Sequence, residues 1–287
     1  MSAKDTARLI YAKGLYRLPL IGSLLDDVRV RRARRLRRES IDQWEEHRRN
    51  GREIIHFLHI GKTGGTAVKE ALKDTTTCGN YVLALHMHNW KLAQVPPGEK
   101  VVFFLRDPVK RFISGFLNQQ RQGLPRYFSA WTPDEALAFE RFHSPNELAL
   151  ALSSEDPGLA HAAEHAMKSI KHVRSSVWEW FGDPEYFLSR KSDVLFVGFQ
   201  ERLNQDFESL KRILGLPISI TLPGGDSAAH RTPEIGDKRL EPRAVENLLN
   251  WYAADYRFLR LCDEAVGVEL PATLTSLHAS RRPTRTG

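Results

Sequence analysis

A six-residue segment, Gly61-Lys62-Thr63-Gly64-Gly65-Thr66, combines residue types that bind phosphate or sulfate groups. It follows an apolar run, residues 54–60, and precedes a sequence typical of a helix, residues 67–72. When a buried strand ends at a glycine-rich turn and continues into a helix, backbone N–H groups are left directed at one spot, where an anion can bind. The segment from 61 to 66 therefore predicts an anion site.

Each residue type in this segment has a separate use at such a site. Gly64 and Gly65 let the backbone approach an anion closely, and Lys62 adds a positive charge. Thr63 and Thr66 add hydroxyl donors. In the nucleotide-triphosphatase loop the lysine follows the last glycine, whereas Lys62 precedes the glycine pair, so ATP is not the expected ligand.

A second candidate anion site follows the apolar run Val101–Leu105. Asp107 is placed to cap a helix whose first residue is Pro108. Helical periodicity puts Ser114 on the polar side of this helix, with Arg106 beside its start, where the two could hold a second phosphate. The alternative makes Arg106 an ion-pair partner and Ser114 an exposed helix residue.

Two histidines, His86 and His88, follow a further apolar run, Tyr81–Leu85. A histidine with a pKa near neutrality is a suitable general base for a hydroxyl group. The two side chains point the same way only if the strand continues through them. Either histidine is a candidate base, and either could instead form hydrogen bonds in the core.

The elements that must position these residues indicate an α/β fold. Apolar runs separated by helix-sized intervals predict a P-loop-like, three-layer fold with a central, mainly parallel sheet flanked by helices. Ligands of such folds bind beyond the carboxyl ends of the strands, where the polar segments lie. We also expect helices between residues 133 and 182 and over 203–214, a strand over 193–199, a loop over 222–236, and a helix that runs from Pro242 through Leu259.

The chain of 287 residues carries a formal charge of +7, and residues 29–38 hold seven arginines and no acid. This run is either a solvated helix face or a contact for an anionic membrane surface, a nucleic acid or an acidic glycan. We expect three parts: a basic, helical N-terminal accessory segment (1–51), a catalytic domain (52–275) and a basic tail (276–287). The chain has two distant cysteines and no apolar run of about 18 residues, which favours a cytoplasmic protein. Peripheral contact with a membrane through the arginines at Arg29–Arg38 is one interpretation of that basic segment.

The two candidate anion sites together resemble motifs of the sulfotransferases. HIGKTGGT at 59–66 is similar to their 5′-phosphosulfate loop, and RDPVKRFISGF at 106–116 is similar to their 3′-phosphate motif, in the same order and with suitable spacing. The resemblance is to the branch that includes the Golgi carbohydrate sulfotransferases, such as the heparan 2-O- and 6-O-sulfotransferases, and many bacterial relatives. A looser likeness, including VGFQERL at 197–203, extends to about residue 262.

The resemblance implies that 3′-phosphoadenosine 5′-phosphosulfate (PAPS) is the donor and that no metal ion is required. It implies a two-part donor site, in which the 5′-phosphosulfate is bound by Lys62, Thr63, Gly64, Gly65 and Thr66, and the 3′-phosphate by Arg106 and Ser114. Lys62 would also neutralise the leaving oxygen. Gly61 departs from the family, which usually has proline there; a glycine loosens the turn without removing a ligand.

Leu85-His86-Met87-His88 resembles the G-H-x-H segment of the heparan 2-O-sulfotransferase group, in which the second histidine is the base, although Leu85 replaces the glycine. The likeness favours His88 as the base and keeps His86 as the alternative. It implies that the acceptor is a hydroxyl group, on a glycan or a glycolipid, and no nucleic acid partner is expected.

Three other functions fit parts of the sequence. His161-Ala-Ala-Glu164-His165 matches an inverted zinc-protease pattern, but five-residue patterns are common by chance. A nucleotide-dependent kinase on the same fold is disfavoured by the order of the loop and by the lack of obvious magnesium-binding acids. A nucleic-acid-binding module driven by Arg29–Arg38 would bind in a strongly salt-dependent way.

Overall fold

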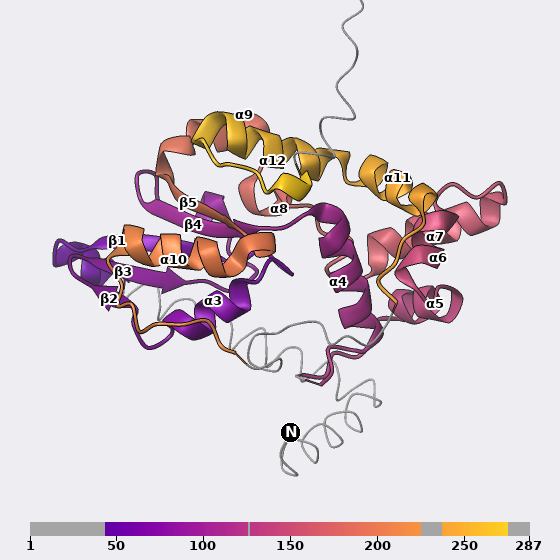
Figure 1. The fold of residues 1–287 in the computed structure, drawn as a ribbon, viewed down its shortest axis with the longest axis horizontal. Coiled ribbons are helices and arrows are strands. Elements are labelled where there is room, and N and C mark those ends of the chain that lie inside the picture. Colours follow the sequence, from indigo (N-terminus) through magenta and orange to yellow (C-terminus); the bar gives the residue numbers. More distant parts are fainter. Residues whose placement is uncertain (1–43, 126, 225–236, 275–287) are drawn as a thin grey trace, which may run out of the picture.

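The computed structural model describes residues 44–125, 127–224 and 237–274 (Figure 1). The arginine run at 29–38, most of the predicted accessory segment, most of the loop after Leu222 and the tail from 276 lie outside the described residues. A short helix is present at 44–49, just before the sheet begins.

The centre of the structure is a five-stranded sheet of order β2-β3-β1-β4-β5. Its strands are β1 (Glu53–Leu58), β2 (Thr77–Cys78), β3 (Tyr81–Leu85), β4 (Lys100–Leu105) and β5 (Val194–Phe199). All neighbouring strands are parallel except β2, which pairs antiparallel with β3. The predicted α/β fold with a mainly parallel sheet is confirmed.

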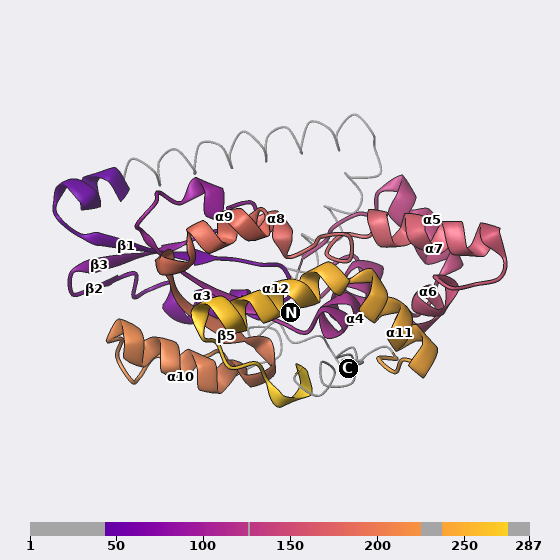
Figure 2. The same ribbon diagram turned by 90° about the horizontal axis from the view of Figure 1, so that it is seen from above.

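Helices cover both faces of the sheet (Figures 1 and 2). On one face, α3 (Gly65–Leu72) and α10 (Leu203–Leu214) bury apolar side chains of alternate strand residues, such as Phe57 and Phe104. The opposite strand residues, such as Leu58 and Phe103, pack in a larger core with α8 (Trp178–Phe181), α9 (Pro184–Ser189) and α12 (Ala253–Val266). Alternation along each strand thus divides the core into two layers.

A group of helices lies to one side of the sheet, beyond α4 (Pro108–Gln120), as both views show. It contains α5 (Pro133–Arg141), α6 (Pro145–Ala151), α7 (Pro157–Ser169) and α11 (Pro242–Trp251). The sequence starts three of them in the same way, with a capping residue followed by proline: Thr132, Ser144 and Asp156 each accept a hydrogen bond from a first-turn N–H group. Proline fits at the first helical position because no helical partner is needed there.

Three details differ from the sequence-based expectations. The helix predicted from Pro242 through Leu259 is wrong as a continuous element, because the chain breaks at Tyr252 between α11 and α12. The hydroxyl of Tyr252 donates to the carbonyl of Val173 at 2.9 Å. The first strand ends at Leu58, two residues before the end of its apolar run, and the two-residue β2 was not predicted.

The strand order brings the polar segments to one edge. Because β1 lies between β3 and β4, the loop after β1 is flanked by the residues after β3 and after β4. Such a point, where the chain crosses from one side of a parallel sheet to the other, is where open α/β sheets bind ligands. None of the helices within the described ranges combines the length and apolarity needed to cross a bilayer.

Candidate functional site

The segment after β1 forms a tight loop that leads directly into α3. Lys62 and Gly64 both have left-handed backbone conformations, with φ of 68° and 86°. The Thr63 hydroxyl donates to the carbonyl of Ile60 at 3.0 Å, so the donor that Thr63 can offer an anion is its backbone N–H. Within the described part of the chain, no side chain caps the start of α3, which leaves its first N–H groups for a ligand.

Gly65 has a structural reason to be glycine as well as the predicted one. A Cβ atom there would lie 2.6 Å from Cδ2 of His59, whose ring is buried beneath the loop. The Thr66 hydroxyl lies 3.4 Å from Nε2 of the same ring. The loop therefore rests on His59, the first residue after β1.

Arg106 joins the two predicted anion sites. Its Nη1 donates to the carbonyl of Lys62 at 3.2 Å. Burial lowers the pKa of Arg106, while the nearby carboxylates of Glu201 and Asp107 act in the opposite direction. No group in the described ranges accepts a hydrogen bond from its buried Nε, so Arg106 retains capacity for an anion beside the loop.

The start of α4 is built as the sequence predicts. Asp107 accepts a hydrogen bond from the Lys110 N–H at 2.8 Å and a second from the hydroxyl of Tyr256 at 3.1 Å. Ser114, further along α4, is buried, with 4% of its surface exposed. The alternative that Ser114 is an exposed helix residue is therefore wrong, and its role as a ligand remains a prediction.

Arg111, on the same side of α4, has a different role from Arg106. Its Nη1 donates to Asp255 of α12 at 3.1 Å, and both side chains are almost fully buried. Asp255 also accepts hydrogen bonds from the Ser176 hydroxyl and the Val177 N–H. Burial raises the pKa of Asp255, and the charge of Arg111 acts in the opposite direction. The ion pair between these two side chains ties α4 to α12. No local sequence pattern indicates this long-range partner.

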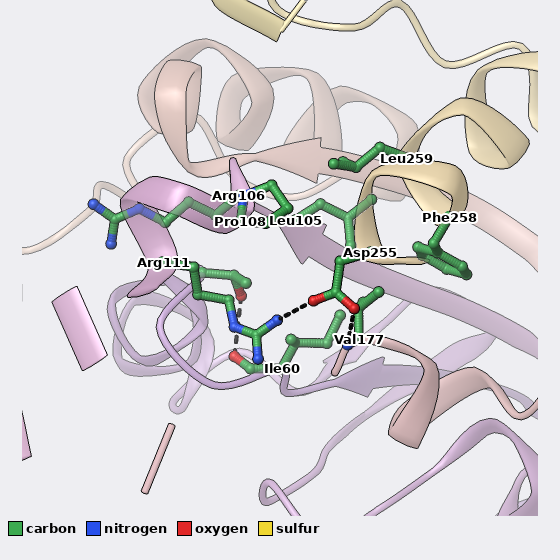
Figure 3. A pocket seen from close by; sticks show the side chains of 10 residues that line it. Ile60, Leu105, Arg106, Pro108, Arg111, Val177, Asp255, Phe258 and Leu259 are labelled. Atoms are coloured by element: carbon green, nitrogen blue, oxygen red, sulfur yellow. Dashed lines mark hydrogen bonds and ion pairs between the residues drawn. The ribbon is translucent and has the colours of Figure 1, made fainter. Parts of the chain in front are cut away.

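A small pocket lies between the ends of β1 and β4 and the start of α12 (Figure 3). Thr63, Arg106 and Asp255 contribute to its lining. Figure 3 shows Arg111 directed at Asp255, whereas the side chain of Arg106 extends away from both. The enclosed space is about 10 Å³, enough for about one water molecule, so this pocket does not enclose a nucleotide.

His88 lies against the loop. Its Nδ1 is 3.0 Å from the carbonyl oxygen of His59, and its ring centroid lies 3.8 Å from that of His59. Because a carbonyl oxygen only accepts, Nδ1 carries the proton and the lone pair is on Nε2. Trp180 of α8 fixes the backbone here, since its indole N–H donates to the carbonyl of His88 at 2.9 Å.

The surroundings of His88 keep its ring neutral. His88 is exposed at the surface, but the protein atoms packed near its ring lower its pKa. The hydrogen bond with His59 acts in the opposite direction, and the charges of Lys69, Lys171 and Lys62 lower the pKa further. A neutral ring with a lone pair on Nε2 has the form that a general base needs.

His86 lies instead in a buried chain of polar groups on the sheet. Its Nε2 is 2.7 Å from Nδ1 of His56, whose Nε2 is 2.6 Å from Glu99. Burial raises the pKa of Glu99, but hydrogen bonds from His56 and Arg48 outweigh this effect and lower it to about 2. The His86 ring also stacks on Trp90, with centroids 4.3 Å apart. The hydrogen-bonding core role, left open from the sequence, describes His86 well.

The zinc-protease pattern lies on α7, away from the sheet edge. His161, Glu164 and His165 are exposed there, and Glu164 pairs with Lys168 at 3.1 Å. The described residues contain no group of three or more histidine, cysteine, aspartate or glutamate side chains placed to hold a metal ion. Cys78 and Cys262 are both free thiols.

The fold is an α/β fold with the predicted anion loop at the switch point of a parallel sheet. A comparison with protein families matches residues 46–260 to the Sulfotransferase family. The chain belongs to this family, and its activity is sulfuryl transfer. A comparison with curated proteins finds no significant match.

Proposed function

We propose that the protein transfers the sulfuryl group of PAPS to a hydroxyl group of a glycan or glycolipid. The observation that carries the proposal is the hydrogen bond from Arg106 to the carbonyl of Lys62, 3.2 Å long. It brings the residue expected to bind a 3′-phosphate next to the loop expected to bind a 5′-phosphosulfate. A donor with anionic groups at both positions fits this pair of sites.

The residues present suit such a donor. The uncapped start of α3, with Gly64 in a left-handed conformation, offers backbone N–H groups to the 5′-phosphosulfate. Lys62 supplies a positive charge at the same loop, and the unused Nε of Arg106 can face the 3′-phosphate. PAPS supplies the activated sulfuryl group, and the protein positions it and stabilises the charge that develops on the leaving phosphate.

His88 is the proposed general base. As the acceptor oxygen forms its bond to sulfur, the bond from sulfur to the leaving phosphate oxygen breaks, and the acceptor proton moves to Nε2 of His88. His86 does not suit this role, because its Nε2 already faces His56 within the core. Of the two histidines considered from the sequence, the geometry therefore favours His88.

Calorimetry with adenosine 3′,5′-bisphosphate tests the donor site. We expect binding to this nucleotide and much weaker binding to ADP, which lacks the 3′-phosphate; Arg106→Ala should remove most of the difference. Tighter binding to ADP with magnesium than to adenosine 3′,5′-bisphosphate would favour the kinase alternative. Failure of the folded protein to bind adenosine 3′,5′-bisphosphate would refute the proposal.

Transfer of labelled sulfate from PAPS to a panel of glycans and glycolipids would identify the acceptor class. In this assay His88→Ala should retain nucleotide binding and lose transfer by about 10²-fold or more, as expected for a missing base. His165→Ala, a change at an exposed histidine on α7, is the matched control and should leave transfer unchanged. Full turnover by His88→Ala would rule out this histidine as the base.

Contact of Arg29–Arg38 with an anionic membrane is a separate proposal, testable with vesicles containing phosphatidylserine.

A further inference from the structure

His172, in the turn between α7 and α8, contacts three parts of the site that are distant from one another in sequence. A Cβ atom at Gly61, in the anion loop, would lie 2.9 Å from Nδ1 of the His172 ring. A Cβ atom at Gly115 of α4 would lie 3.2 Å from the His172 backbone. The His172 ring is also 5.9 Å, centroid to centroid, from the ring of His88. It therefore lies where the loop, α4 and the proposed base meet.

The backbone of His172 is held in an unfavourable conformation. Its φ of 67° is left-handed, which costs a residue with a side chain about 1–2 kcal/mol. Both neighbouring residues are tied down: the Lys171 N–H donates to buried Glu135 at 2.9 Å, and the Val173 carbonyl accepts from Tyr252 at 2.9 Å. A glycine would adopt this conformation without that cost, so what histidine adds here is its ring.

The ring of His172 also accounts for the glycine at position 61. Any side chain there would meet Nδ1 of His172 closer than ordinary contact distance. The missing side chain at Gly61 therefore leaves room for this ring. Gly61 and His172 form a matched pair across the site.

The ring carries no charge into this cationic region. Burial lowers the pKa of His172 to about 2, and Lys62, His88 and Lys171 contribute in the same direction. A neutral ring beside His88 therefore adds no further positive charge. The charged groups that His88 experiences are then Lys69, Lys171 and Lys62.

We infer that His172 is a positioning residue, whose ring fills the space between the loop at Gly61 and the ring of His88, fixes both and covers part of His88. The effect of His172 on sulfuryl transfer rests on the proposed function, but its contacts with the loop and with His88 can be tested without measuring turnover. Removal of the ring should hydrate His88 and loosen the loop, while the fold keeps its stability.

The test is His172→Gly, with two measurements on the full chain. NMR titration of His88 should show its midpoint raised toward the ordinary value for histidine, because burial is the main cause of its lowered pKa. Calorimetry should show adenosine 3′,5′-bisphosphate bound about tenfold more weakly, a change of about 1.4 kcal/mol, because the loop beside Gly61 is no longer held by the ring. The thermal midpoint should stay level or rise, because the left-handed strain is relieved.

Gln122→Gly is the matched control, because Gln122 is also a left-handed residue with a side chain, φ 53°. It follows the far end of α4, about 20 Å along the helix from Arg106 at 1.5 Å per residue. We expect no change in nucleotide affinity or in the His88 titration. An unchanged His88 titration in a folded His172→Gly variant would overturn the inference; if that variant does not fold, His172→Asn, which tolerates the same backbone, decides by the same criterion.

A double-mutant cycle tests the pairing directly. Gly61→Ala alone should lower the thermal midpoint, because its methyl group collides with the His172 ring. Combined with His172→Gly, the same change should cost nothing, since the ring is gone. Equal losses in both backgrounds would contradict the pairing. If the wild-type protein does not bind adenosine 3′,5′-bisphosphate, the proposed donor site is refuted. The role of His172 is then decided by the double-mutant cycle and by the His88 titration.

Discussion

Replacing His86 by alanine should lower the stability of the protein without removing its chemistry. The His86 ring is 4% exposed, lies 2.7 Å from Nδ1 of His56, stacks on Trp90 and meets the edge of Trp44 at 5.0 Å between centroids. None of these contacts faces the anion loop. The change therefore removes a buried hydrogen bond and two ring contacts at once.

The size of the loss can be worked out from these contacts. Leaving a buried polar atom of His56 without its partner costs about 1–3 kcal/mol. Each aromatic contact is worth about 0.5–1.5 kcal/mol beyond the area it buries. A total near 4 kcal/mol follows, which for a domain of this size corresponds to a fall in thermal midpoint of about 8–16 °C.

Differential scanning calorimetry measures the stability loss, and transfer assays well below the midpoint measure the chemistry. We expect turnover per folded molecule to stay within about threefold of wild type, in contrast to the loss of about 10²-fold expected for His88→Ala. A stable His86→Ala protein that has lost transfer to the same extent as His88→Ala would show the reasoning to be wrong, and would make His86 the base.

A glutamine at position 86 provides the matched control. Its side-chain amide can replace the Nε2–H group of histidine as a donor toward His56, although it does not stack on Trp90 as an imidazole does. His86→Gln should therefore recover the part of the stability that belongs to the hydrogen bond. If it is no more stable than His86→Ala, ring packing alone holds His86 in place.

Two further predictions concern buried charges. Glu99→Gln should lower the free energy of unfolding by about 1–2 kcal/mol at pH 7, a figure already reduced for partial exposure. The pKa of Glu99 is lowered to about 2, so the ionised carboxylate stabilises the fold fully above its ordinary pKa and loses this effect as the pH falls through 2. Unfolding curves of the variant and the wild type should therefore converge in acid. Asp255→Ala should cost about 3–5 kcal/mol in urea titrations by leaving Arg111 buried without its partner, whereas Asp237→Asn, in an exposed pair with Arg239, should have no measurable effect.

Much of the fold could be predicted because local sequence determines it. The strand Tyr81–Leu85 and the helix Leu203–Leu214 have the predicted bounds, since each is an uninterrupted pattern with clear signals at its ends. The break between α11 and α12 could not be predicted, because Tyr252 continues the apolar periodicity through it. Its cause is a hydrogen bond to Val173, which lies far away in the sequence.

The candidate site shows the same division between local and distant information. Glycine, lysine and threonine after a strand identify the anion loop, and Asp107-Pro108 identifies the start of α4. The partners of Arg111 and the role of His172 have no local signal, because both depend on contacts between segments far apart in the chain. From the sequence alone, Gly61 is only a position that lacks the expected proline. In the structure it leaves room for the ring of His172.

The two histidines after β3 differ because the strand ends before them. Pairing with β1 continues for only one more residue, as the His86 N–H donates to the carbonyl of Phe57 at 3.2 Å, and this directs the His86 ring toward His56. The chain then turns, and His88 meets the carbonyl of His59 at the start of the loop. That carbonyl fixes the proton on Nδ1 and leaves Nε2 as the basic atom. The point at which pairing with β1 ends therefore determines which histidine can act as a base beside the anion loop.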